Sequence, residues 1–200
     1  MAGYFPLSQR PRRDESSVSN NWARHTGTVL LELTGVLEAL EPSDWQTPSL
    51  RPALTVRDVV AELVWLSSTT RWQRLLTPSA RSAGEPAAVE PAALTARVRE
   101  LATAALAPSA TRTVAHLSHA VVAAYEVARA TRHPLAIDPL ASGAVALARG
   151  LGGPIGARAV TRERTLVATD AEWSVGRGPA IEGTAEAIVL FLFQRGTLGG

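Results

Sequence analysis

The stretch from Glu38 to Leu66, EALEPSDWQTPSLRPALTVRDVVAELVWL, constrains the fold more than any other part of the chain. It contains the end of one amphipathic pattern, a loop with prolines at 48 and 52, and the start of a second amphipathic pattern. Proline removes a backbone donor and clashes inside a helix, so this loop cannot be helical through its middle. Trp45 is the apolar side chain expected to pin the loop to the core. The stretch therefore predicts two helices joined by a pinned loop.

Apolar residues at three- and four-residue steps predict a helix on each side of the loop. The first helix follows Asn21 and is ended by Pro42. The second begins at Thr55, because Thr55 and Asp58 have the spacing of an N-cap threonine and an acid that favours the helix dipole. This second helix is expected to run to about Leu76.

The rest of the pattern extends a helical fold towards the C-terminus. β-Branched residues on either side of Gly176 and Gly178 predict two short strands or a hairpin. The very apolar last helix suits either a buried core helix or a dimer contact. We predict a mainly α fold, an up-and-down four-helix bundle with a small C-terminal helix, β-hairpin and helix appendage. The further helices are expected at Ala92–Leu106, Thr111–Thr131, Pro139–Leu151 and Thr184–Gln194.

Composition indicates one domain. The 200 residues are 46% hydrophobic and 19% charged, which is enough to bury a substantial core. Residues 1–18 mix proline, serine and charge without a period, so we expect a disordered tail there. A single domain is expected over 19–200.

Several kinds of chemistry are excluded by what the chain lacks. All 20 basic residues are arginine and 18 acidic residues nearly balance them, which argues against nucleic-acid binding. Without cysteine there is no thiolate nucleophile or thiolate metal site, and without lysine no Schiff base. No apolar run reaches the roughly 18 residues that cross a membrane, and no apolar signal core is present. We expect a cytoplasmic protein.

The loop and the helix after it resemble a known family. WQTPSL resembles a W-x-x-P-S-L loop, and TVRDVVAEL resembles T-V-R-D-V-V-A-H-L, in the mycothiol-dependent maleylpyruvate isomerase family of the DinB-like four-helix-bundle group. AAYEVARATRHP is similar to the later family segment H-x-x-D-h-A-R-A-x-G-x-P, where h is apolar. TLVATDAEWSVGRGP also resembles a segment near the family's end, so the resemblance covers most of residues 22 to 195. It implies a DinB-like bundle.

The resemblance implies a divalent metal, zinc or nickel, held in the bundle by a histidine of the second helix and by a glutamate and a histidine four residues apart on a later helix. Glu62 stands at the position of the first histidine. The later segment aligns His119 with the glutamate, Ala123 with the second histidine and Glu126 with a family aspartate. Two expected ligand types are thus exchanged, and the third is lost.

The residues themselves leave several sites open. His116 and His119 share a helical face, and with Glu62 from a facing helix they form a candidate metal triad. The same histidines suit a partly exposed polar stripe. Without a metal, Glu62 and His119 could act as base and acid across a cavity, or could simply form an ion pair. The candidate substrate-pocket residues are Trp65, Tyr125 and Glu126.

The leading hypothesis is a small-molecule-converting protein that resembles the thiol-dependent isomerases and transferases of this family. Mycothiol and a divalent metal are the cofactors that the resemblance implies, and the absence of protein cysteine suits an external thiol. One alternative is a non-catalytic ligand-binding or dimerising module. Another is a metal-independent isomerase or cyclase that uses Glu62 and His119. The expected partners are a small molecule and a second copy of the chain, with no nucleic acid and no membrane.

Overall fold

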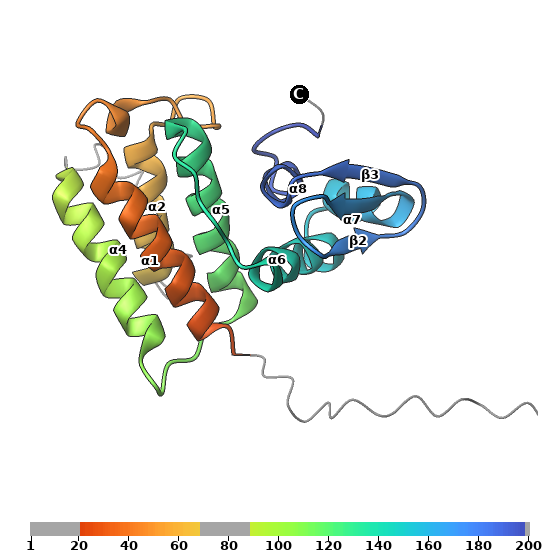
Figure 1. Cartoon of the computed structure of the whole chain (residues 1–200), viewed down its shortest axis with the longest axis horizontal. Helices are drawn as coiled ribbons and strands as arrows, with labels where there is room; N and C mark the ends of the chain where they lie inside the picture. The colour runs from red at the N-terminus through yellow and green to blue at the C-terminus, as the bar shows by residue number, and fades with distance from the viewer. Residues whose placement is uncertain (1–20, 69–88, 199–200) are drawn as a thin grey trace, which may run out of the picture.

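The computed structural model describes residues 21–68 and 89–198, and these residues are mainly helical, with a small three-stranded sheet near the C-terminus (Figure 1). The mainly α class is therefore confirmed. The predicted tail over 1–18 and the predicted end of the second helix near Leu76 lie outside the described residues.

Four helices pack side by side to form the larger part of the fold. Contacts join each of the first two to each of the last two, so the four enclose a common core (Figure 1). Apart from the end of α2, whose predicted position lies outside the described residues, their starts and ends follow the predicted ones within a few residues. The four helices are α1 (Ala23–Ala39), α2 (Val56–Ser68), α4 (Pro91–Leu106) and α5 (Val114–Thr131).

The directions of these helices differ from a simple up-and-down order. α1 and α5 begin at the same end, where the Trp22 N–H donates to the Arg112 carbonyl oxygen over 2.8 Å. α4 also ends there, as its last residue, Leu106, packs against Gly27 near the start of α1. α2 runs opposite to α1 and α5, so α2 and α4 point the same way (Figure 1). Two parallel consecutive helices need a long connection rather than a tight turn, and 22 residues, 69–90, separate α2 from α4.

The core explains why the loop between α1 and α2 is ordered. Trp45 lies in the short 3-10 helix η2 (Asp44–Gln46) and is buried in the main hydrophobic cluster, as predicted. At the start of α2 the Thr55 N–H and hydroxyl both donate to the Asp58 carboxylate over 2.8 Å, and the Asp58 N–H donates to the Thr55 hydroxyl oxygen. The predicted helix start is therefore confirmed.

The C-terminal part packs against α5. It begins with α6 (Pro139–Gly152), which contacts α5, and it ends with α8 (Ala185–Leu192), which contacts both α5 and α6. The side chains of α8 at Ile188, Val189 and Leu190 are fully buried, so α8 is a core helix. Among the described residues, no helix combines the length and the apolar character that crossing a bilayer requires.

Between α6 and α8 lie a helix that the sequence did not predict, α7 (Ile155–Glu163), and three strands, β1 (Thr165–Ala168), β2 (Ser174–Gly176) and β3 (Ala180–Gly183). β1 is central, antiparallel to β2 and parallel to β3. The two short strands predicted around Gly176 and Gly178 are β2 and β3, but they do not pair with each other; the hairpin is formed by β1 and β2, with its turn at 169–173.

The two glycines serve the crossing from β2 to β3. Gly176 and Gly178 have φ values of +107° and +105°, a backbone conformation that glycine adopts readily and other residues rarely do. A Cβ on Gly176 would lie 2.1 Å from the Arg164 carbonyl oxygen, so the chain passes too close to its own backbone for any side chain. The glycines therefore let β3 reach the far edge of β1.

Candidate functional site

A cavity of about 100 Å³ lies between α2 and α5 at the surface of the bundle core. The lining positions on each helix recur three and four residues apart, which places them on one helical face. The lining mixes apolar and charged side chains. The apolar lining residues are Val59, Leu63, Leu66, Val122, Ala123 and Phe193, and the polar ones are Arg51, Glu62, Ser118, His119, Glu126 and Arg195.

Arg51 reaches this cavity from the loop before α2, and the backbone of that loop is held by its own hydrogen bonds. The Ser49 N–H donates to the Leu54 carbonyl oxygen over 2.8 Å, and the Leu54 N–H donates back to the Arg51 carbonyl oxygen over 3.2 Å. The Ser49 hydroxyl accepts from the Arg51 N–H over 3.1 Å. This closed turn fixes where the arginine side chain leaves the backbone.

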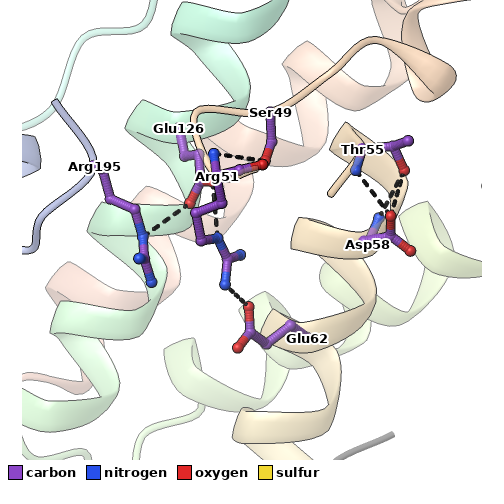
Figure 2. A network of polar contacts seen from close by, with 7 residues as sticks. All are labelled: Ser49, Arg51, Thr55, Asp58, Glu62, Glu126 and Arg195. Atoms are coloured by element: carbon purple, nitrogen blue, oxygen red, sulfur yellow. Dashed lines mark hydrogen bonds and ion pairs between the residues drawn. The ribbon is translucent and has the colours of Figure 1, made fainter. Parts of the chain in front are cut away.

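The Arg51 guanidinium bridges two carboxylates on facing helices (Figure 2). Its Nε donates to Glu126 Oε1 of α5 over 3.0 Å, and its Nη1 contacts Glu62 Oε2 of α2. Arg195, which follows α8, brings its Nε to 3.6 Å from Glu126 Oε2. Two guanidinium groups and two carboxylates thus form one balanced ion cluster, called here the Arg51 cluster.

Burial differs sharply between the two carboxylates of the Arg51 cluster. The Glu126 side chain is 1% exposed, whereas the Glu62 side chain is 42% exposed. A buried carboxylate depends on its partners, because leaving water costs several kcal/mol unless charge and hydrogen bonds compensate. Glu126 is therefore the structural centre of the cluster, and Glu62 is the member that a molecule entering the cavity can reach.

The electrostatics keep both arginines charged. Burial lowers the pKa of Arg51, but the hydrogen bonds and charges of Glu62 and Glu126 raise it by more, so it lies above its ordinary value. For Arg195, burial and the neighbouring Arg51 charge outweigh the attraction of Glu126 and lower the pKa. Arginine has a pKa far above neutrality, so neither shift neutralises the side chain at physiological pH.

Three of the residues singled out from the sequence meet in this cavity. Glu62, His119 and Glu126 all line it, from facing helices. Glu62 is half-exposed and Glu126 is buried under the two arginines. The structure therefore places the predicted base and acid, Glu62 and His119, in one cavity.

Two predicted pocket residues lie elsewhere. Tyr125 is one position before Glu126, so its side chain leaves α5 in another direction, as expected for a helix with 3.6 residues per turn. It lines a more open hollow of about 490 Å³ together with Arg129 and Glu186. Burial raises the pKa of Tyr125 to about 12, although a hydrogen bond with Ser142 opposes the shift. Trp65 of α2 is half-buried and is not among the residues that line the cavity.

His116 takes part in the start of α5. Its Nδ1 lies 2.9 Å from the Thr113 hydroxyl and forms a capping box with the N-cap residue. It does not line the cavity, so the structure does not bring the predicted metal triad of Glu62, His116 and His119 together there. Of the two histidines, His119 is the one that lines the cavity.

The cavity does not fit the divalent metal that the family resemblance implies. In the described ranges, 21–68 and 89–198, no group of three or more His, Cys, Asp or Glu residues could hold an ion. The two carboxylates nearest the expected position, Glu62 and Glu126, are both bound by Arg51. A guanidinium already supplies the positive charge between them.

Sequence reasoning missed the two arginines. Arg51 lies between the prolines at 48 and 52, and Arg195 directly follows the most apolar helix of the chain. A cation next to buried segments is a signal that it meets a buried acid, because lone buried charges are costly. Neither the buried partner nor the cavity follows from the sequence, since Glu126 is 75 positions from Arg51 and 69 positions from Arg195.

Comparison of the chain with protein-family models, with curated proteins and with solved structures finds no match. The resemblance of the Trp45 loop and α2 to the maleylpyruvate isomerase family stays a prediction. Function is argued below from the cavity and the contacts within it.

Proposed function

We propose that this protein is a small-molecule-binding bundle of the DinB-like group, whose cavity works without a bound metal. The observation that carries this proposal is the position of the Arg51 guanidinium between Glu62 and Glu126. In the resembled family a divalent metal supplies the positive charge between the corresponding helices. Here a side chain of the protein takes that place.

The arrangement of the helices supports the group assignment. The cavity lies between α2 and α5, the two helices to which the resemblance assigns the family's ligands. The loop before α2 is pinned by Trp45, and the helix start is capped by Thr55 and Asp58, in the segment that carries the resemblance. The sequence pattern and the position of the cavity therefore point to the same part of the fold.

The size and the lining of the cavity describe its ligand. A cavity of about 150 Å³ in a protein core can hold benzene, so about 100 Å³ accommodates a smaller molecule or one end of a larger one. The apolar side chains of Leu63, Val122 and Phe193 would hold a hydrocarbon part. The exposed edge of Glu62 and the His119 ring would orient its polar groups. The ligand class is a small molecule with an apolar body and a polar end.

Metal content tests the first half of the proposal. Tag-free protein, and a Glu62→Ala variant beside it, should contain no stoichiometric zinc or nickel by inductively coupled plasma mass spectrometry, before or after incubation with either ion. Stoichiometric metal in the wild type that is lost in the variant would refute the proposal. A turnover that needs both that metal and mycothiol would restore thiol-dependent chemistry.

Ligand binding tests the second half. A fragment library screened by ligand-observed NMR should yield binders that Ala123→Leu abolishes, because the larger side chain fills the cavity without adding or removing a charge. Ala93→Leu, at an exposed position of α4, is the matched control and should leave binding unchanged. Fragments that bind both variants equally, or no binders at all, would count against the cavity.

Acid–base catalysis is the second candidate, and one observation favours it. Glu62 and His119 line the same cavity from facing helices, so one can accept a proton while the other donates one. In an isomerisation or cyclisation, Glu62 would remove a proton from carbon next to a carbonyl, and His119 would protonate the neighbouring position. Arg51 would fix the orientation of the Glu62 carboxylate.

Hydrogen exchange separates catalysis from binding. A carbonyl compound found in the fragment screen is incubated with the protein in D₂O, and loss of its acidic C–H signal is followed by NMR. Catalysis predicts exchange that Glu62→Gln removes while binding persists. Bound ligand with no exchange above the protein-free rate would leave a binding protein only.

A further inference from the structure

An apolar stripe runs along the outward face of α6 and onto α7. Leu140, Ala144, Leu147 and Leu151 recur at steps of four, three and four, which places them within an arc of about 60° on a helix with 3.6 residues per turn. Ile155 continues the row at the start of α7. The large side chains are 58%, 50%, 71% and 77% exposed in chain order. These five residues are called here the α6 stripe.

The remaining side of α6 is already packed into the protein. Ala141, Val145 and Ala146 are buried, and contacts join α6 to α5, α7, α8 and β2. Arg149 is the only charged residue of the helix. It turns inward, where its guanidinium stacks 4.3 Å above the Phe193 ring and its Nε donates to the Leu192 carbonyl oxygen over 3.1 Å. The α6 stripe therefore contains no charge and no polar side chain.

A helix that is apolar all round is normally buried on all sides. Scattered exposed leucines are ordinary, but a continuous row of them marks a surface that another molecule covers. The exposed fractions show that the described residues leave the stripe uncovered.

We infer that the α6 stripe is the contact between two copies of this chain, packed across a two-fold axis with their α6 helices antiparallel. A two-fold contact needs a surface complementary to itself. A charge-free row of leucines meets this condition, because pairing it with itself sets no like charges together. Antiparallel α6 helices also align opposite ends of their dipoles, which parallel ones would not.

The composition of the stripe suits the centre of a dimer interface. Such a centre is more apolar and poorer in charge than the rest of an interface. Four large side chains, each at least half exposed, supply a centre of this kind.

Other occupants fit the stripe less well. A helix that lies on a membrane surface carries lysine or arginine on its polar side. The one arginine of α6 is turned onto Phe193, whereas α7 carries Arg158 and Arg162, so the α6 part of the stripe is the part that lacks such a side chain. A small ligand needs a concave site, and the stripe is a row of protruding side chains. A second copy of the chain needs neither basic side chains nor a concave site.

The test is the concentration-dependent mass of the full chain by sedimentation and light scattering. The wild type should be a dimer that Leu147→Glu and Leu151→Glu each weaken by roughly tenfold or more, because the new carboxylate would be buried in an apolar contact. Leu31→Glu, at a leucine of α1 with 44% exposure, is the matched control and should leave the dimer intact. Circular dichroism of each variant checks that it folds.

Three results would overturn the inference. The first is a wild type that stays monomeric at about 100 μM, and the second is a dimer that all three variants leave unchanged. The third is dimerisation that occurs only after residues 1–20 have been removed, which would assign the stripe to that segment.

The native chain has no cysteine, so a single introduced thiol gives a second readout that does not depend on the glutamate variants. The antiparallel axis falls between Ala144 and Leu147, the middle of the stripe. Mild oxidation should therefore join two copies of Ala144→Cys by a disulfide and leave Leu31→Cys monomeric. Failure of Ala144→Cys to cross-link, or equal cross-linking of both variants, would overturn the antiparallel contact.

Discussion

Replacing Arg51 by methionine removes the cation of the Arg51 cluster while keeping an unbranched apolar side chain of similar length. Glu126, 1% exposed, then loses the hydrogen bond that Arg51 Nε donates over 3.0 Å. Arg195 remains, but its Nε lies 3.6 Å from the other carboxylate oxygen, too far for a hydrogen bond. Arg51→Met therefore leaves a buried carboxylate with one distant partner.

The size of the effect follows from burial. Removing one partner of a buried ion pair costs about 3–5 kcal/mol of the free energy of unfolding, and the Arg195 charge holds the expected loss near the lower value. For a chain of this length, about 3 kcal/mol corresponds to a fall in Tm of roughly 6–12 °C. Glu62→Gln breaks the other half of the cluster, but Glu62 is 42% exposed, so its loss should stay within about 1 kcal/mol.

The free energy of unfolding is measured by urea unfolding, followed by tryptophan fluorescence. The variants are Arg51→Met, Glu62→Gln, Glu126→Gln and the double variant Arg51→Met/Glu126→Gln. Removing both charges together leaves no buried carboxylate. The double variant should therefore lose at least about 2 kcal/mol less than the sum of its two single variants. An Arg51→Met variant as stable as Glu62→Gln, or strictly additive losses, would refute the view that Arg51 compensates the buried charge of Glu126.

Three further predictions concern the scaffold. Thr55→Ala should lower the free energy of unfolding by about 1 kcal/mol through loss of the cap, and Thr103→Ala, at an exposed position of α4, should not lower it; equal losses in urea unfolding would contradict this. Gly176→Ala should lower the free energy of unfolding by about 3 kcal/mol or more, since its φ is +107° and a backbone oxygen lies 2.1 Å from the new Cβ. Gly35→Ala, whose Cβ would meet no atom within 4 Å, should instead stabilise α1 by about 0.5–1 kcal/mol. Burial raises the pKa of Tyr125 in the folded protein to about 12, above the unfolded value near 10. The resulting contribution to the free energy of unfolding, about 2–3 kcal/mol, is complete below pH 10 and is lost as the pH rises through about 12. Absorbance titration and urea unfolding from pH 9 to 12 should show this loss in the wild type and not in Tyr125→Phe.

Local signals in the sequence predicted the helices well because their causes are local. The apolar period, Pro42, and the pairing of Thr55 with Asp58 act within a few residues, and the structure places α1 and the start of α2 accordingly. The direction of α4 relative to α2 was not predictable in this way. It depends on how the four helices share a core, and the period of each helix is the same in either direction.

The sheet shows the same limit at shorter range. The glycines at 176 and 178 correctly indicated a sharp change of chain direction, but not that β1 would lie between β2 and β3. That order depends on pairing between segments up to 15 residues apart, with no turn residues to mark it. The short helix α7 was missed because its arginines interrupt the apolar pattern.

The candidate site was predictable only as far as single side chains reveal it. Glu62, His119 and Glu126 were identified from their positions and do meet in one cavity. Tyr125 was assigned to the same pocket, but it lines the other hollow, with Arg129 and Glu186. Arg51 was passed over because an arginine in a loop is ordinarily solvated, and only the packed structure shows it facing two carboxylates.

A guanidinium and a divalent metal answer the same physical need in a helical bundle, but with different consequences. A buried carboxylate such as Glu126 needs a nearby cation, and either group can supply it. A metal can be removed by chelators, and its ligands are lost when protons compete for them, whereas Arg51 is covalently attached and cannot be deprotonated near neutral pH. The charge of the Arg51 cluster is therefore permanent. A guanidinium is also no Lewis acid, so the proposed metal-free cavity would act through the proton donors and acceptors that line it, with Glu62 and His119 foremost.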